Sequence, residues 1–267
     1  MASQAKRPWY MFYPLAGMIL LSLIWCGYWF IAFSGAKELI QAKRLEFAGQ
    51  GMELICARES WGGFPFRFEF QCETATLHFI HTEIQTTKIL AIAQAYNPLH
   101  VIVLVDGPTS IDRTTVTHDR ALISVKINTR LDLAADTTEL TVIRPDNPPI
   151  TVSSAELVGH TSGQTLEISR LKISQGAVDF VATGTVSLDA QHRLAGKLSS
   201  QTNDLDGLMK SIEPFLALNE QDSTAIKNLV TLTGSDPKTN TTKADFVARE
   251  GALYWGLIKL VDLTPLY

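Results

Sequence analysis

The stretch FPFRFEFQCE, residues 64–73, alternates apolar and polar side chains residue by residue. Phe64, Phe66, Phe68, Phe70 and Cys72 fall on one face, and Pro65, Arg67, Glu69, Gln71 and Glu73 fall on the other. A period of two is typical of a β-strand with one buried face. Pro65 has no N–H to donate, so we expect it at a strand beginning, a bulge or an edge. Arg67 is expected to find a carboxylate or a carbonyl on the face opposite the phenylalanines.

Strand patterns continue on both sides of this stretch, with turn signals every 8 to 12 residues or so. The further candidates are residues 52–61, 75–81, 84–91, 100–105, 121–128, 131–133, 139–143, 150–158, 166–173, 177–188, 194–200, 244–249 and 252–261. Consecutive short strands predict antiparallel meanders, and the lack of helices alternating with strands argues against a parallel α/β fold.

Two short helices near the C-terminus interrupt the strands. Asn203 or Asp204 can cap the first, whose stripe from Leu205 to Leu216 we interpret as core packing, and Asp222 can cap the second. The predicted fold is therefore mainly β (α+β): a curved antiparallel β-sheet or a sandwich-like domain. Val178 and Phe180 share a face of the strand at 177–188, and we expect them to join the phenylalanines in a closed core or an open groove.

An uncharged segment precedes all of these strands. No charged residue lies between Arg7 and Lys37, and residues 15–33 are almost wholly apolar. About 20 such residues cross a hydrocarbon core of about 30 Å. Residues 1–36 are thus predicted to be a short tip and a transmembrane anchor, and residues 37–267 a β-rich domain outside the cytoplasm, starting with a short helix or turn at 36–46. The alternative, a cleaved signal peptide, has a shorter apolar region.

Basic residues flank the anchor almost equally, so they do not decide its orientation. Cys56 and Cys72 lie on either side of the predicted turn at Trp61-Gly62-Gly63. A disulfide between them would persist only outside the cytoplasm, whereas two separate buried thiols are the alternative. We therefore place the N-terminus in the cytoplasm and the domain in the periplasm of a single-pass inner-membrane protein.

Motifs of catalysis or cofactor binding are absent from the sequence, including the nucleophile elbow, the phosphate-binding loop and the zinc-binding H-E-x-x-H. His78 and His81 are spaced so that they leave a strand on opposite faces, which argues against a metal pair. A net charge of −4 without basic clusters argues against nucleic acid. No catalytic residue, metal or cofactor is predicted.

Three sequence elements resemble an uncharacterised bacterial family, domain of unknown function 2125. They are the Gly63-Phe64-Pro65-Phe66-Arg67 motif between Cys56 and Cys72, Pro98-Leu99-His100-Val101 with Asp106-Gly107-Pro108, and Arg249-Glu250-Gly251 with Leu263-Thr264-Pro265-Leu266. The family is distantly similar to the AsmA-like group of membrane-anchored periplasmic proteins, a fold-level analogy. The resemblance implies a binding or scaffolding protein that handles membrane lipids or another hydrophobic envelope component. The alternative is a structural accessory subunit of an inner-membrane protein complex, and a hydrolase is a third reading.

Overall fold

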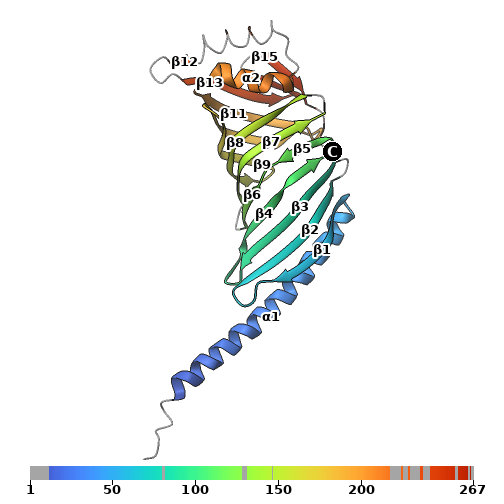
Figure 1. Ribbon diagram of the computed structural model, residues 1–267, viewed down its shortest axis with the longest axis vertical. Coiled ribbons are helices and arrows are strands. Elements are labelled where there is room, and N and C mark those ends of the chain that lie inside the picture. Colours follow the sequence, from blue (N-terminus) through green and yellow to red (C-terminus); the bar gives the residue numbers. More distant parts are fainter. Residues whose placement is uncertain are drawn as a thin grey trace, which may run out of the picture.

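The computed structural model describes residues 12–79, 82–127, 131–145, 147–216, 224, 228, 235–236, 241–255, 258–263 and 265. Figure 1 shows a long N-terminal helix, a strongly twisted sheet and a short helix at the far end of that sheet. All structural statements below concern these residues. His81 and most of the predicted helix after Asp222 lie outside them.

Helix α1, Tyr13–Ala48, is a single element of 36 residues. It runs without a break through residue 36, so the segment predicted as a short helix or turn is its last three turns, with Gly49 as C-cap. Residues between Gly35 and Gly49 include no glycine or proline and are mostly strong helix formers, which explains the continuation. The helix is long and apolar enough to cross a membrane, with a mean hydropathy of 1.9 over 18 residues.

All fifteen described strands form one antiparallel sheet in which neighbours in space are, with few exceptions, neighbours in sequence (Figure 1). The strands are β1 Met52–Gly62, β2 Arg67–Phe79, β3 Thr82–Gln94, β4 Asn97–Ile111, β5 Thr114–Thr117, β6 Arg120–Ile127, β7 Leu131–Arg144, β8 Asn147–Ser162, β9 Thr165–Gln175, β10 Val178–Leu188, β11 Leu194–Thr202, β12 Ser235–Asp236, β13 Thr241–Arg249, β14 Ala252–Trp255 and β15 Ile258–Asp262. β5 and β6 each pair with both β4 and β7. A meander of this kind confirms the predicted curved antiparallel sheet.

Several strands are longer than the sequence predicted. Residues 64–73 and 75–81 contribute to one strand, β2, and residues 131–133 and 139–143 to one strand, β7. Thr74 and Glu139 have positive φ angles of 48° and 52° inside these strands. Both irregularities are accommodated without ending the ladder, because the flanking residues remain paired with the neighbouring strands.

The returning strand starts later than its alternation suggests. β2 begins at Arg67, and Phe64 and Phe66 lie in the preceding turn, which the Arg67 N–H closes by donating to the Gly63 carbonyl over 3.0 Å. The prediction that these two phenylalanines belong to the strand is therefore wrong. Gly63 has a φ of +100°, and a Cβ there would lie 2.4 Å from the Arg67 carbonyl oxygen, so the turn requires glycine.

Helix α2, Leu205–Leu216, packs on the sheet at its C-terminal end. The Asp204 carboxylate accepts the Gly207 N–H over 2.9 Å and caps the helix. Met209 and Trp255 are fully buried here with Leu260, and Leu205, Leu208 and Phe246 pack against them. Leu205, Leu208 and Met209 of the predicted stripe thus belong to a hydrophobic core, as their spacing suggested, whereas the side chains of residues 212–216 lie outside the described part of the chain.

Candidate functional site

One face of the sheet is apolar from β2 to β10. Strand register decides this, because residues paired across an antiparallel ladder point to the same side. We define the apolar face as three adjacent rows of paired residues. The rows are Cys72, Ile89, Val105, Ala121, Thr137, Ala155, Ile173 and Phe180; Phe70, Ala91, Val103, Ile123, Ala135, Leu157, Leu171 and Ala182; and Phe68, Ala93, Val101, Val125, Leu133, Gly159, Ile168 and Gly184.

No charged side chain interrupts these rows, and most of their members are only half-buried. Eight strands spaced at about 4.8 Å, with five residues along each at about 3.3 Å, cover roughly 34 Å by 13 Å. Among the residues predicted to form an apolar surface, Phe68, Phe70 and Phe180 lie in the rows, and Val178 lies on the same side two residues before Phe180. The side chains are therefore brought together across more than a hundred residues of sequence.

The second half of α1 covers the β2 end of the apolar face (Figure 1). Between helix and sheet lies a groove of about 250 Å³, slightly below the range of about 300–1,000 Å³ that is typical of small-molecule pockets. Ala32, Phe33, Ala36 and Ile40 line it from the helix, and Trp61, Phe68, Phe70, Ala91, Ala93 and Val101 line it from the sheet. Alanines at facing positions leave the space that larger side chains would fill.

Helix α2 covers the opposite end of the same face. Phe180 and Phe246 contact each other with ring centroids 6.1 Å apart, and Phe246 stacks on Trp255 at 5.1 Å. A Cβ at Gly207 would lie 2.5 Å from the Val178 side chain, so α2 lies directly on β10. Within the described part of the chain, no helix other than α1 and α2 packs on the apolar face, and its middle is uncovered.

The other face of the sheet is different in chemistry. One of its rows runs through Arg58, Glu73, Lys88, Asp106 and Arg120. Arg58 pairs with Glu73 at 3.3 Å, and Arg120 with Asp106 at 2.6 Å. Arg67, expected to meet a carboxylate opposite the phenylalanines, pairs with Glu69 at 2.5 Å. Charged pairs lie on this outer face beside aliphatic rows such as Leu90, Leu104 and Leu122, whereas the three inner rows hold no charged side chain. We take the uncharged inner face as the candidate binding surface.

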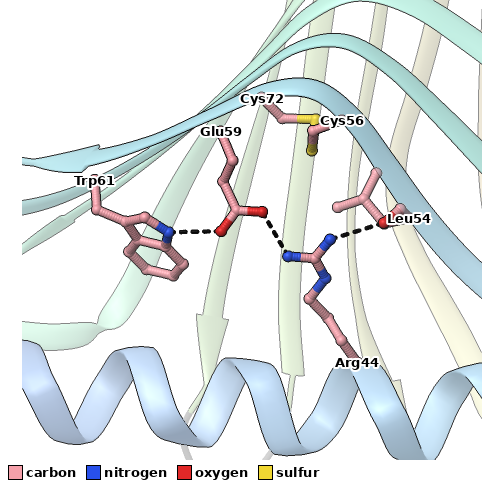
Figure 2. A network of polar contacts seen from close by, with 6 residues as sticks. All are labelled: Arg44, Leu54, Cys56, Glu59, Trp61 and Cys72. Atoms are coloured by element: carbon pink, nitrogen blue, oxygen red, sulfur yellow. Dashed lines mark hydrogen bonds and ion pairs between the residues drawn. A yellow bond between two sulfur atoms is a disulfide. The ribbon is translucent and has the colours of Figure 1, made fainter.

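A polar contact fastens α1 to the sheet above the groove. Arg44 donates from Nη1 to Glu59 over 2.7 Å and from Nη2 to the Leu54 carbonyl over 2.8 Å, while Trp61 Nε1 donates to the other Glu59 oxygen over 2.7 Å. Figure 2 shows Arg44 extending from the helix to this carboxylate. Burial raises the pKa of Glu59, but hydrogen bonds from Arg44 and Trp61 and the charges of Arg44 and Lys37 outweigh it, so the pKa lies below its usual 4.5.

A disulfide joins Cys56 and Cys72 beside this contact, with the two Cα atoms 5.3 Å apart (Figure 2). The bond links β1 to β2 on the side that faces α1. Cys26, in α1, is a free cysteine. Arg44 and Glu59 thus join the helix to β1, and the disulfide joins β1 to β2. Sequence reasoning found the cysteines but missed Arg44 and Glu59, which are 15 residues apart and carry no motif.

Acidification is expected to weaken this contact. Since the folded-state pKa of Glu59 is depressed, its ionised form stabilises the protein above pH 4.5, and this contribution is lost as pH falls through the lower folded-state value. Thermal unfolding of the full chain in detergent micelles, followed from neutral pH to below 4.5, measures it. Glu59→Gln should flatten the acid limb of the profile, while Glu53→Gln, at an exposed position of the same strand, should keep the wild-type slope. Identical acid limbs for wild type and Glu59→Gln would contradict the assignment.

Other polar groups do not assemble into a recognisable centre. Within the described ranges, no three His, Cys, Asp or Glu side chains are placed to hold a metal ion. His160 Nε2 lies 3.1 Å from Glu167 Oε2. A hollow of about 480 Å³ at β10, β11 and β13 is lined partly by Asp179, Asn203 and Lys243, and it is larger than the groove but lies far from α1. We base the site on the groove because it continues into the apolar face.

The fold and the apolar face define a β-rich protein carried on a long apolar N-terminal helix. A family model described as "uncharacterized protein conserved in bacteria (DUF2125)" matches residues 29–164 and 158–264. The chain belongs to this bacterial family, which confirms the resemblance found in the sequence. No curated protein and no solved structure matches the chain. The more distant similarity to the AsmA-like group is not shown by these comparisons and stays a hypothesis.

Proposed function

We propose that the protein is anchored in the bacterial inner membrane by α1 and binds the acyl chains of membrane lipids along the apolar face of its periplasmic sheet. The observation that carries the proposal is the continuity of that face: three uncharged rows across eight strands, covered at one end by the anchor helix and at the other by α2. The groove beside α1 is the point at which a lipid leaving the bilayer would first meet the sheet.

Size supports this reading. The footprint of the apolar face is roughly 34 Å by 13 Å, and most of its side chains are half-buried. One leaflet supplies about half of a hydrocarbon core of about 30 Å, so an extended acyl chain fits within the length of the face. A headgroup would remain outside, because the rows contain no charged partner for it.

The disulfide supports the periplasmic side. Bonds of this kind form and persist in the bacterial periplasm and are rare in the cytoplasm, where thiols are kept reduced. Cys56 and Cys72 are bonded in the folded domain. With the domain in the periplasm and a single span, the N-terminus lies in the cytoplasm.

Photo-cross-linking in intact membranes tests the binding. A benzoylphenylalanine at Val103, on the apolar face, should capture phospholipid, detected as a mass increase of the purified protein. The matched control is Ile102, the preceding residue of β4, which is equally half-buried but points to the opposite face. Equal lipid capture at both positions, or none at either, would overturn the proposal. Capture of one protein of defined mass at Val103 would instead favour the accessory-subunit role.

A charge placed in the apolar face should abolish lipid capture. Ala135→Glu puts a carboxylate two strands from Val103, where an acyl chain could not satisfy it, so cross-linking at Val103 should fall at least several-fold. Ala134→Glu introduces the same side chain one residue earlier on β7, on the opposite face, and should leave capture unchanged. The pair also separates lost binding from lost folding, since both variants introduce the same charged side chain into the same strand. Equal capture in the two variants would contradict the role of the face.

A further inference from the structure

Two turns of the sheet lie beside the middle of α1. The β1–β2 turn contains Phe64, Pro65 and Phe66, and the β3–β4 turn contains Ala95 and Tyr96. The Ala95 N–H donates to the Phe66 carbonyl over 2.8 Å and so joins the turns. Both are charge-free and form the end of the sheet nearest to the N-terminal half of the helix.

Three aromatic donors of α1 bind these turns. Trp25 Nε1 donates to the Pro65 carbonyl over 2.9 Å, Tyr28 Oη to the Ala95 carbonyl over 2.9 Å, and Trp29 Nε1 to the Arg67 carbonyl over 3.1 Å. Trp29 is only 3% exposed and contacts Phe64 and Phe68 edge to face or tilted. The sheet therefore meets the helix at residues 25–29, which sets the depth of the turns relative to any membrane that the helix crosses.

The part of α1 that precedes Trp25 is too short to span a bilayer by itself. Residues 12–24 come to about 20 Å at 1.5 Å per residue. Even if the uncharged residues from Pro8 are counted at helical rise, the 17 residues up to Ile24 reach only about 26 Å, less than a hydrocarbon core of about 30 Å. The apolar run instead continues to Phe33 and the first charge is Lys37. A bilayer matched to this run extends past Trp25 and Trp29 and reaches the turns.

The side chains and hydrogen bonds of the turns suit a location in the bilayer. In the turns, Phe64, Phe66 and Tyr96 are 52%, 64% and 69% exposed, and Leu99, near the start of β4, is 56% exposed, an unusual set of large apolar side chains for a surface in water. Backbone carbonyls at membrane depth must be satisfied within the protein, and the Trp25, Tyr28 and Trp29 donors satisfy one each. Aromatic side chains with a polar tip suit the headgroup boundary, where one end is apolar and the other wet.

We infer that the β1–β2 and β3–β4 turns insert into the outer leaflet of the bilayer that α1 spans, so that Phe64, Phe66 and Tyr96 form a second membrane contact beside the helix. The inference rests on the anchoring role proposed for α1 and adds how deeply the sheet lies relative to the bilayer. It also places the lower end of the groove, at Tyr28 and Phe33, at the level of the acyl chains. A lipid could then enter the groove without crossing water.

Depth-dependent quenching in phospholipid vesicles tests the insertion. The full chain, in a Cys26→Ser background with the disulfide intact, carries an environment-sensitive fluorophore on a cysteine at Phe66, Tyr96, Leu20 or Arg113. Leu20 lies in the first half of α1 and reports the anchor. Arg113 follows β4, whose 15 residues separate it from Tyr96 by about 50 Å. The vesicles contain phosphatidylethanolamine and phosphatidylglycerol with a nitroxide at a shallow or a deep position of one acyl chain.

Fluorophores at Phe66 and Tyr96 should be quenched several-fold more by the shallow nitroxide than the one at Arg113, and should be protected from aqueous iodide. If the deep nitroxide strongly quenches the fluorophore at Leu20 while those at Phe66 and Tyr96 are quenched as little as the one at Arg113, the insertion is overturned. The anchoring role of α1 is then retained. Absence of lipid quenching at Leu20 would overturn both the anchor and the insertion.

Discussion

Replacing Cys56 and Cys72 together with serine is expected to lower the free energy of unfolding by about 3 kcal/mol. The bond closes a loop across a sequence separation of 16, and cross-links of that length remove about 3 kcal/mol of chain entropy from the unfolded state. The double variant avoids an unpaired thiol in the junction beside Arg44 and Glu59. Loss of the bond also frees β1 and β2 to separate under α1, so we expect the junction between helix and sheet to open first.

Denaturant unfolding of the full chain in detergent micelles, followed by tryptophan fluorescence, measures the loss. Cys26→Ser is the matched control, because it removes a free sulfur of the same size from α1 and should change stability little. Thiol titration of denatured, non-reduced wild type should find one free cysteine. A double variant that unfolds at the same denaturant concentration as Cys26→Ser would contradict the structural role of the bond.

Met209→Ala is expected to destabilise the α2 end of the sheet by about 2–5 kcal/mol. Met209 is fully buried against Trp255 and Leu260, and truncation of such a side chain loses both its transfer free energy and the contacts around the cavity it leaves. Because Met209 is the fully buried α2 side chain in this core, the helix should detach from Val178 and expose the far end of the apolar face.

Met209→Leu is the control for this prediction. It conserves volume and should cost less than about 1.5 kcal/mol. Limited proteolysis of the two variants gives a local readout, since cleavage at α2 should accelerate in the alanine variant well before global unfolding. Equal cleavage rates in the alanine and leucine variants would show that α2 is not held by this core.

Most of the fold can be predicted from local patterns. The uncharged run before Lys37 predicts a long apolar helix, and alternation in residues 67–73 predicts β2 and its two faces. Strand ends are harder to place. Asp106-Gly107-Pro108 is a turn signal, yet β4 runs through it to Ile111. The gap between β5 and β6, at His118 and Asp119, lies opposite this segment and accommodates the irregularity. The reverse occurs at Phe64 and Phe66, where the alternation predicts a strand but the residues form a turn. Gly63 and Pro65 end the ladder there.

The site illustrates where local patterns stop being informative. Trp25, Tyr28 and Trp29 lie in the uncharged run of α1, but their partners are carbonyls 40, 67 and 38 residues away, respectively. Arg44 and Glu59 form their ion pair only because α1 continues past the predicted boundary and the chain reverses at residues 49–51, so that β1 runs back along the helix. Neither contact has a spacing or motif that a reader of the sequence could use.

By itself, then, the sequence determined the family, the apolar helix, the antiparallel strands and the apolar side of each strand, because these depend on residue type and on periods of two or 3.6 residues. Only the tertiary structure decided that the apolar sides of β2 to β10 form one continuous surface with α1 at one end and α2 at the other. A slip of one residue in any pairing would turn a strand over and interrupt the rows, and register is set by contacts between strands rather than within them.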